Sequence, residues 1–136
     1  MHTTNYTNTF IAVAEDCPVN KAEIPALKGD SKTVANLQFE MVYDHPYKYT
    51  SDDILFTVHA IRNKIAAKDL KAEREKFFSK GQPCLRASPL TKRYGWGAHS
   101  DAAGKVAIYD MDSKEYKKFL ADKKLEHTKA MRSKRG

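Results

Sequence analysis

The chain has 136 residues and a mass of 15.4 kDa, which is the size of one ordinary domain. Hydrophobic residues make up 41% of it, and no apolar run reaches the roughly 18 residues that a membrane-spanning helix needs. The first twenty residues contain no lysine, no arginine and no long apolar block, so we expect no secretory signal. Two cysteines are too few for a disulfide framework or a four-thiolate zinc site. We therefore expect a cytoplasmic protein without a metal or a cofactor.

The net charge of +7 is concentrated at the C-terminus. Residues 114–136 contain nine basic and three acidic side chains, whereas the other 113 residues contain 15 basic and 14 acidic ones. A pI near 9.4 is typical of proteins with a basic binding face. In this chain such a face would lie in the C-terminal segment, because the rest of the chain is close to neutral.

The first predicted element is a strand at residues 8–14, whose apolar run stops before Pro18. Residues 15–32 contain two prolines, one glycine and little apolar periodicity, which predicts a long loop. Apolar residues then recur at helical spacing from residue 33 to residue 43. Pro46 predicts the end of this helix, because proline disfavours the helical conformation in the residue before it.

Two further helices are predicted in the next part of the chain. Ser51 is expected to cap the first of them. Its buried stripe would consist of Ile54, Val58, Ile61 and Ile65. The β-branched residues in this stretch leave a strand open as the alternative. Asp69 is expected to cap the second helix, which would run to Lys80 with Leu70 among its apolar contacts.

A β-hairpin at about residues 94–110 is the clearest local prediction. Apolar and small residues alternate from 94 to 99, and a second apolar run follows at 105–109. Asp101 and Gly104 suit a type I turn followed by a left-handed glycine bulge.

Shorter elements are predicted on either side of the hairpin. Residues 84–87 favour a brief strand, and Ser88 followed by Pro89 favours one helical turn. After the hairpin, Asp112 and Glu115 have the spacing of a capping box and predict the start of a last helix.

The chain is expected to form one globular domain over residues 1–122, followed by a flexible basic tail at 123–136. The tail offers the core only Leu125 and Met131, so its removal should change the melting temperature little. The order strand, helices, hairpin, helix favours an α+β domain over a doubly wound parallel sheet, which needs regular alternation. We expect a small, mainly antiparallel sheet, containing residues 8–14 and the hairpin, packed against three or four helices.

The strand from Tyr94 to Gly97 carries two glycines on one face, which permit something to approach the backbone closely. One interpretation is a helix packed flat over the glycines. The alternative is a ligand surface, in which paired arginine donors hold an anion beside the aromatic rings. The candidate ligand-binding residues are Arg86, Lys92, Arg93, Tyr94, Trp96 and His99.

Cys84 is the candidate nucleophile, with His59 or His99 as its possible base. The alternative is a buried and inert thiol. The spacings CxxC, HxH and HExxH do not occur, and neither do GxGxxG or GxxxxGK[ST]. The sequence therefore predicts neither a metal site nor a nucleotide-binding loop.

Three tyrosines, Tyr43, Tyr47 and Tyr49, surround His45 in a predicted loop. Neighbouring aromatic rings of this kind can form a platform on which a base or a sugar stacks. The alternative is that the rings hold the loop against the edge of the core while their hydroxyls stay in water.

Several short strings spread along the chain are similar to those of one protein family. They are residues 1–6, 9–14, 49–53, 72–78, 88–97 and 129–135, of which the string SPLTKRYGWG at 88–97 is the most specific. On these strings the chain resembles a family of small bacterial proteins known as a domain of unknown function. The resemblance implies a bacterial, cytoplasmic, one-domain protein and assigns no catalytic residue.

We expect a binding module rather than an enzyme, because the sequence contains no recognised nucleophile–base spacing, metal set or phosphate loop. The expected partner is a polyanion such as RNA or DNA. The residues expected to bind it are Lys123, Lys124, Lys129, Arg132, Lys134 and Arg135. No aromatic residue follows Phe119, so binding should be electrostatic and should weaken steeply with salt.

Two alternatives remain open at this stage. The basic residues of the tail could serve only to keep a surface solvated. The protein could also be a small enzyme or a metabolite-binding protein, with a pocket around Trp96, Tyr94, His99 and Arg93.

Overall fold

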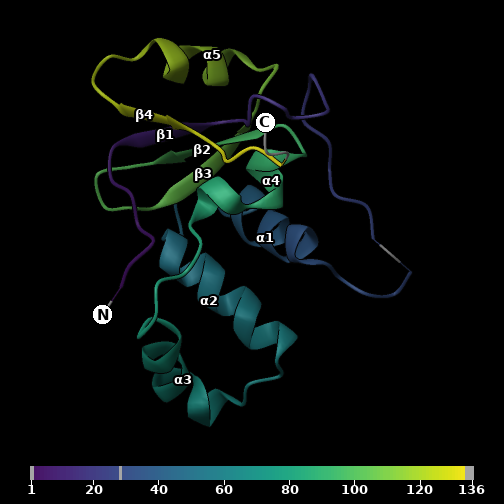
Figure 1. Ribbon diagram of the computed structural model, residues 1–136, viewed down its shortest axis with the longest axis vertical. Helices are drawn as coiled ribbons and strands as arrows, with labels where there is room; N and C mark the ends of the chain where they lie inside the picture. Colours follow the sequence, from purple (N-terminus) through teal and green to yellow (C-terminus); the bar gives the residue numbers. More distant parts are fainter. Residues whose placement is uncertain (1, 28, 134–136) are drawn as a thin grey trace.

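The computed structural model describes residues 2–27 and 29–133, and its centre is one four-stranded sheet in the order β3-β2-β1-β4 (Figure 1). The strands are β1 (Thr9–Ala12), β2 (Trp96–Ser100), β3 (Val106–Asp110) and β4 (Glu126–Lys129). β2 is antiparallel to both β1 and β3, whereas β4 runs parallel to β1. The fold is α+β with a mixed, mostly antiparallel sheet, which confirms the fold class predicted from the sequence.

Helices cover both faces of the sheet (Figure 1). They are α1 (Val34–Tyr43), α2 (Ser51–Arg62), α3 (Leu70–Phe77), α4 (Pro89–Lys92) and α5 (Lys114–Ala121), with single 3-10 turns at η1 (Ala67–Asp69) and η2 (Leu85–Ala87). α5 lies on one face, while α1 and α4 lie on the other, and α2 and α3 extend away from the sheet beyond them (Figure 1). No helix in the described part of the chain is long and apolar enough to cross a membrane.

The two faces of β1 are buried in two different hydrophobic clusters. Phe10 is fully buried under α5, where its ring lies 5.1 Å from Tyr116 and 5.2 Å from Phe119. The next residue, Ile11, is fully buried on the other face among residues that include Ile54. The strand therefore reads as a continuous apolar run, as predicted for a strand covered on both faces.

Two helix caps differ by one residue from the predicted ones. Thr50, not Ser51, caps α2, because its extended backbone lets its hydroxyl accept a hydrogen bond from the Asp53 amide. Ser51 is used elsewhere, and its buried hydroxyl lies 2.9 Å from that of Thr4. In the same way Ser113, not Asp112, caps α5.

The structure also corrects the prediction of a brief strand at 84–87, because residues 85–87 form the 3-10 turn η2. The helical turn that begins at Pro89 and the hairpin are confirmed. In the hairpin turn the amide of Gly104 donates to the carbonyl of Asp101 at 3.0 Å, and Gly104 has a φ of +79°. This left-handed conformation is the one that the predicted turn requires of its glycine.

The predicted flexible tail is wrong for residues 126–129, which form the strand β4 beside β1. The following residue, Ala130, is 5% exposed and donates its amide to the carbonyl of Ala12 at 2.8 Å. Sequence periodicity missed this strand because it is polar and exposed, so backbone hydrogen bonds hold it in place. Lys134 and Arg135 lie outside the described residues.

Candidate functional site

The two glycines of the SPLTKRYGWG string are covered by protein. A side chain at Gly97 would meet the ring of Tyr116 at 2.5 Å and that of Phe10 at 2.6 Å. Gly95 has a φ of +79° and lies against the loop residues Val19 and Lys21. The interpretation of a helix packed over the glycines thus fits Gly97, which faces α5, while a loop covers Gly95.

Trp96 and His99 lie on opposite faces of the sheet, because side chains three positions apart on a strand point in opposite directions. Trp96 is 6% exposed on the α1 face, where its indole N–H donates to the carbonyl of Glu23 at 2.9 Å. His99 stacks on Phe119 of α5 with ring centroids 4.3 Å apart. The structure therefore does not bring the two aromatic candidates into one pocket.

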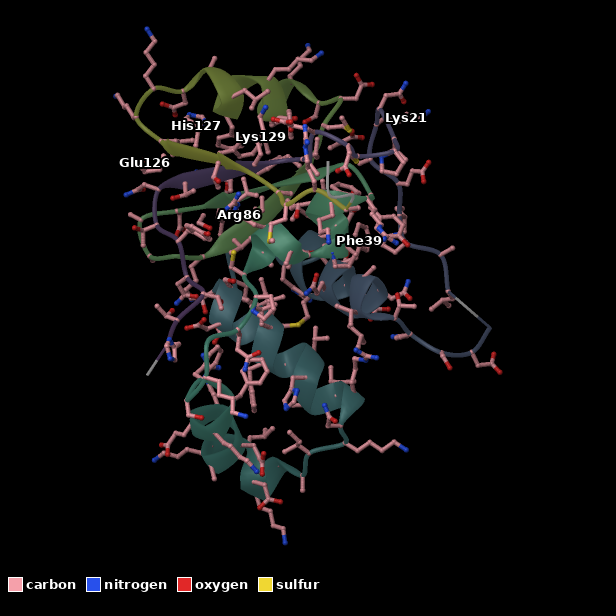
Figure 2. The ribbon with its side chains drawn as sticks, viewed as in Figure 1. Lys21, Phe39, Arg86, Glu126, His127 and Lys129 are labelled. Atoms are coloured by element: carbon pink, nitrogen blue, oxygen red, sulfur yellow. The ribbon has the colours of Figure 1, made fainter. Side chains whose placement is uncertain are left out.

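The remaining candidates on this segment are also separated. Arg86 holds the C-terminal segment, since its Nε donates to the carbonyl of Lys129 at 2.7 Å and its own carbonyl accepts from Met131 (Figure 2). Tyr94 packs beside Trp96, whereas Arg93 is exposed at the end of α4 and Lys92 is half-buried. A pocket of about 470 Å³ does open beside Trp96, but its wall includes none of the other candidates.

Of the three tyrosines around His45, Tyr47 is bound to the sheet. Its hydroxyl lies 2.8 Å from Nδ1 of His99 and 2.8 Å from the hydroxyl of Tyr109. Burial raises the pKa of Tyr47, and the hydrogen bond with Tyr109 raises it further. Burial also lowers the pKa of His99, although Asp101 opposes this shift. These hydrogen bonds hold the loop on the edge of the core.

Cys84 and His59 line the same pocket, a space of about 530 Å³ between α1, α2 and residues 82–89. They are engaged with different neighbours, because the Cys84 thiol bonds the Tyr6 hydroxyl at 3.3 Å and His59 Nδ1 lies 3.3 Å from the amide nitrogen of Asn63. Burial and the Cys84 hydrogen bond raise the pKa of Tyr6 to about 12. Among the described residues no hydrogen bond joins His59 to the thiol.

The chemistry of a metal site is also lacking in the region that the structure covers. Among residues 2–27 and 29–133, no group of three or more His, Cys, Asp or Glu side chains could hold a metal ion.

Five exposed lysines gather on α5 and on the turn that follows it. We call this set the lysine face, and it consists of Lys114, Lys117, Lys118, Lys123 and Lys124. The helical lysines lie on the side opposite Tyr116 and Phe119, the residues that pack on the sheet. Within the described ranges none of the five ammonium groups forms an ion pair, and the same stretch contains only two carboxylates, Glu115 and Asp122.

Two of the predicted polyanion-binding residues are instead tied to a carboxylate. Lys129 lies 3.2 Å and Arg132 lies 2.7 Å from the carboxylate oxygens of Glu15. These two cations hold the pKa of Glu15 below its usual value. The basic C-terminal segment thus divides into a paired part around Glu15 and an unpaired part, the lysine face, which sequence reasoning did not separate.

Comparison with known proteins places this chain in a family but not in a functional class. Searches of the curated proteins and of the solved structures each gave no match. One family model matches residues 1–136, and its description is "Family of unknown function (DUF6157)". Because the match covers the whole chain, this protein belongs to the DUF6157 family.

Proposed function

We propose that the protein is a binding module whose lysine face binds polyanions, with nucleic acid as the natural partner. The observation that carries the proposal is the set of five exposed ammonium groups on α5 and the turn after it, which form no ion pair with any residue that the structure describes. Helix neighbours three and four positions apart lie roughly 5–6 Å from each other. Lys114, Lys117 and Lys118 therefore present a compact cationic cluster to a phosphate backbone.

The position of α5 favours such a contact. α5 covers the sheet from outside, and no helix of the described residues lies on its outer side (Figure 1). A long polyanion can therefore lie along the helix without displacing any described part of the protein. Neighbouring phosphates would each gain an ammonium partner, and the release of counterions would drive association.

The binding is expected to be electrostatic and independent of base sequence, because the lysine face contains no aromatic side chain on which bases could stack. For single-stranded nucleic acid the logarithmic salt slope is about −0.7 per phosphate neutralised. Five contacts therefore predict a loss of affinity of roughly 100-fold between 50 and 200 mM salt.

The proposal is tested by fluorescence anisotropy with a labelled 20-nucleotide RNA at these two salt concentrations. The variant K114Q/K117Q/K118Q should bind at least tenfold more weakly at 50 mM salt and show a shallower salt slope. K68Q/K76Q/K80Q is the matched control, because it removes three exposed lysines from the opposite end of the molecule. Equal losses in both variants, or no binding by the native protein at 50 mM salt, would contradict the proposal.

A further inference from the structure

An apolar groove lies between α2 and α3, at the end of the molecule farthest from α5 (Figure 1). Its volume is about 690 Å³, which is within the range of small-molecule sites. Apolar side chains of both helices line it, among them Phe56, Ile61 and Leu70, together with the basic residues Lys64, Lys71 and Arg74.

The groove leaves large apolar side chains in contact with water. Ile61 of α2 is 52% exposed and Leu70 of α3 is 38% exposed, while Phe56 beneath them is buried. α3 packs mainly on α2 and on the turn η1, and the described residues leave Ile61 and Leu70 partly exposed. A bound apolar group that covered them would remove this apolar surface from water, which is favourable.

The charge at the groove is of one sign. Lys64, Lys71 and Arg74 line it, and none of its lining residues is acidic. Arg74 is fixed by an ion pair with Asp53 at 3.0 Å and by its position over the ring of Phe56. Lys64 and Lys71 form no ion pair within residues 2–27 and 29–133, so their ammonium groups are available to an anion.

We infer that this groove binds a small amphipathic anion, namely a carboxylate with an unbranched or aromatic apolar tail. The tail would cover Ile61 and Leu70, and the carboxylate would interact with Lys64 and Lys71 at the rim. The occupant follows from charge complementarity, because an apolar floor and a purely cationic rim match a ligand with one apolar end and one anionic end. This site is independent of the lysine face.

The test compares decanoate with decan-1-ol, which has the same tail and a neutral head. Binding is measured below the micelle concentration from amide chemical shifts of the ¹⁵N-labelled full-length protein. Decanoate should bind at least tenfold more tightly than decan-1-ol and should shift mainly the amides of residues 56–74. Equal affinities, no binding of decanoate, or shifts spread over the whole protein would overturn the inference.

Paired variants locate the two ends of the ligand. K64Q/K71Q should weaken decanoate binding at least tenfold and change decan-1-ol binding less than twofold. I61Q/L70Q, at two partly exposed positions, should weaken the binding of both probes. K114Q/K117Q/K118Q should change neither, and a loss of decanoate binding in this variant would overturn the inference. Binding of an acidic amphipathic peptide in the absence of decanoate binding would assign the groove to a protein partner instead.

Discussion

The hydroxyl of Tyr47 lies 2.8 Å from Nδ1 of His99, and this contact fixes a loop to the central strand β2. Tyr47 has a φ of +60°, a left-handed conformation that costs a residue other than glycine roughly 1–2 kcal/mol. Two sets of hydrogen bonds offset this cost: those of the Tyr47 hydroxyl, and the one that the Tyr47 backbone amide donates to the carbonyl of Val106 at 2.9 Å. These hydrogen bonds account for the position of the Tyr47 ring without a base or a sugar stacked on it.

Substitution Tyr47→Phe is expected to lower the free energy of unfolding by about 1–2 kcal/mol, because it leaves His99 and Tyr109 without a buried partner. Urea denaturation measures the change. Tyr43→Phe is the matched control, since the ring of Tyr43 is half-exposed and its hydroxyl makes no hydrogen bond to the described residues. A decrease of unfolding free energy of similar size in both variants would show that the hydrogen bonds of the Tyr47 hydroxyl do not stabilise the fold.

The stability of the protein should depend on the protonation of His99. Burial lowers the folded-state pKa of His99 below its usual value, so the folded protein favours the neutral ring. The stabilisation is complete above about pH 7 and is lost as the pH falls through the folded-state pKa. His99→Gln should flatten this part of the curve of unfolding free energy against pH, whereas His45→Gln, at an exposed ring, should leave it unchanged.

Ala130 is expected to be sensitive to substitution although it follows an exposed strand. Ala130→Glu would bury a carboxylate in the core and should cost at least about 2 kcal/mol of unfolding free energy. Met131→Glu, one position further on and 52% exposed, should cost less than about 0.5 kcal/mol.

Truncation after Asp122 should lower the melting temperature markedly, because it removes β4 and the buried Ala130. An unchanged melting temperature would show that β4 is dispensable.

Glu15 forms an ion pair with Lys129 of the C-terminal segment, so Glu15→Gln should release this ammonium group for a polyanion. We expect RNA affinity at 50 mM salt to rise, with a steeper salt slope, because Lys129 loses its ion pair with Glu15. Glu75→Gln on α3 makes the same change in net charge at an exposed site with no ion pair among the described residues. Equal increases of RNA affinity in the two variants would show that the effect comes from net charge alone.

Gly97→Ala should be strongly destabilising, because the added methyl group would meet the buried rings of Tyr116 and Phe10 at about 2.5–2.6 Å. Overpacking of this kind costs about 1–3 kcal/mol. Gly81→Ala is the control, since no atom lies within 4 Å of the added group and Gly81 has no positive φ. Thermal unfolding of the two variants distinguishes a tightly covered strand from an open ligand surface.

The hairpin could be predicted from the sequence because its signals are local: the alternation of its strands and the pair Asp101 and Gly104 in its turn. β4 could not, because polar residues such as Glu126 and His127 carry no apolar periodicity, and the strand exists through pairing with β1. The basic segment was visible in the composition. The division of this segment into a part paired with Glu15 and the lysine face could not be predicted, because Glu15 and Arg132 are 117 positions apart in sequence.

The groove was missed for a different reason. The helical spacing of Ile61 with its apolar neighbours predicted a buried stripe, and Leu70 was expected among the buried contacts of the next helix. Periodicity shows which side chains share a face of a helix, but it does not show whether a second layer covers that face. In the structure Ile61 of this stripe is 52% exposed, whereas Ile65 is partly buried against the cluster that contains Phe56.

The parallel pairing of β1 with β4 has a consequence for synthesis. β1 leaves the ribosome first, yet its two sheet neighbours begin at Trp96 and Glu126. Phe10 therefore cannot be buried until α5 has been synthesised, whereas α1, α2 and α3 have partners close by in sequence. During translation the helical part can form early, and the nascent first strand stays exposed to chaperones or to other chains until the last strand emerges.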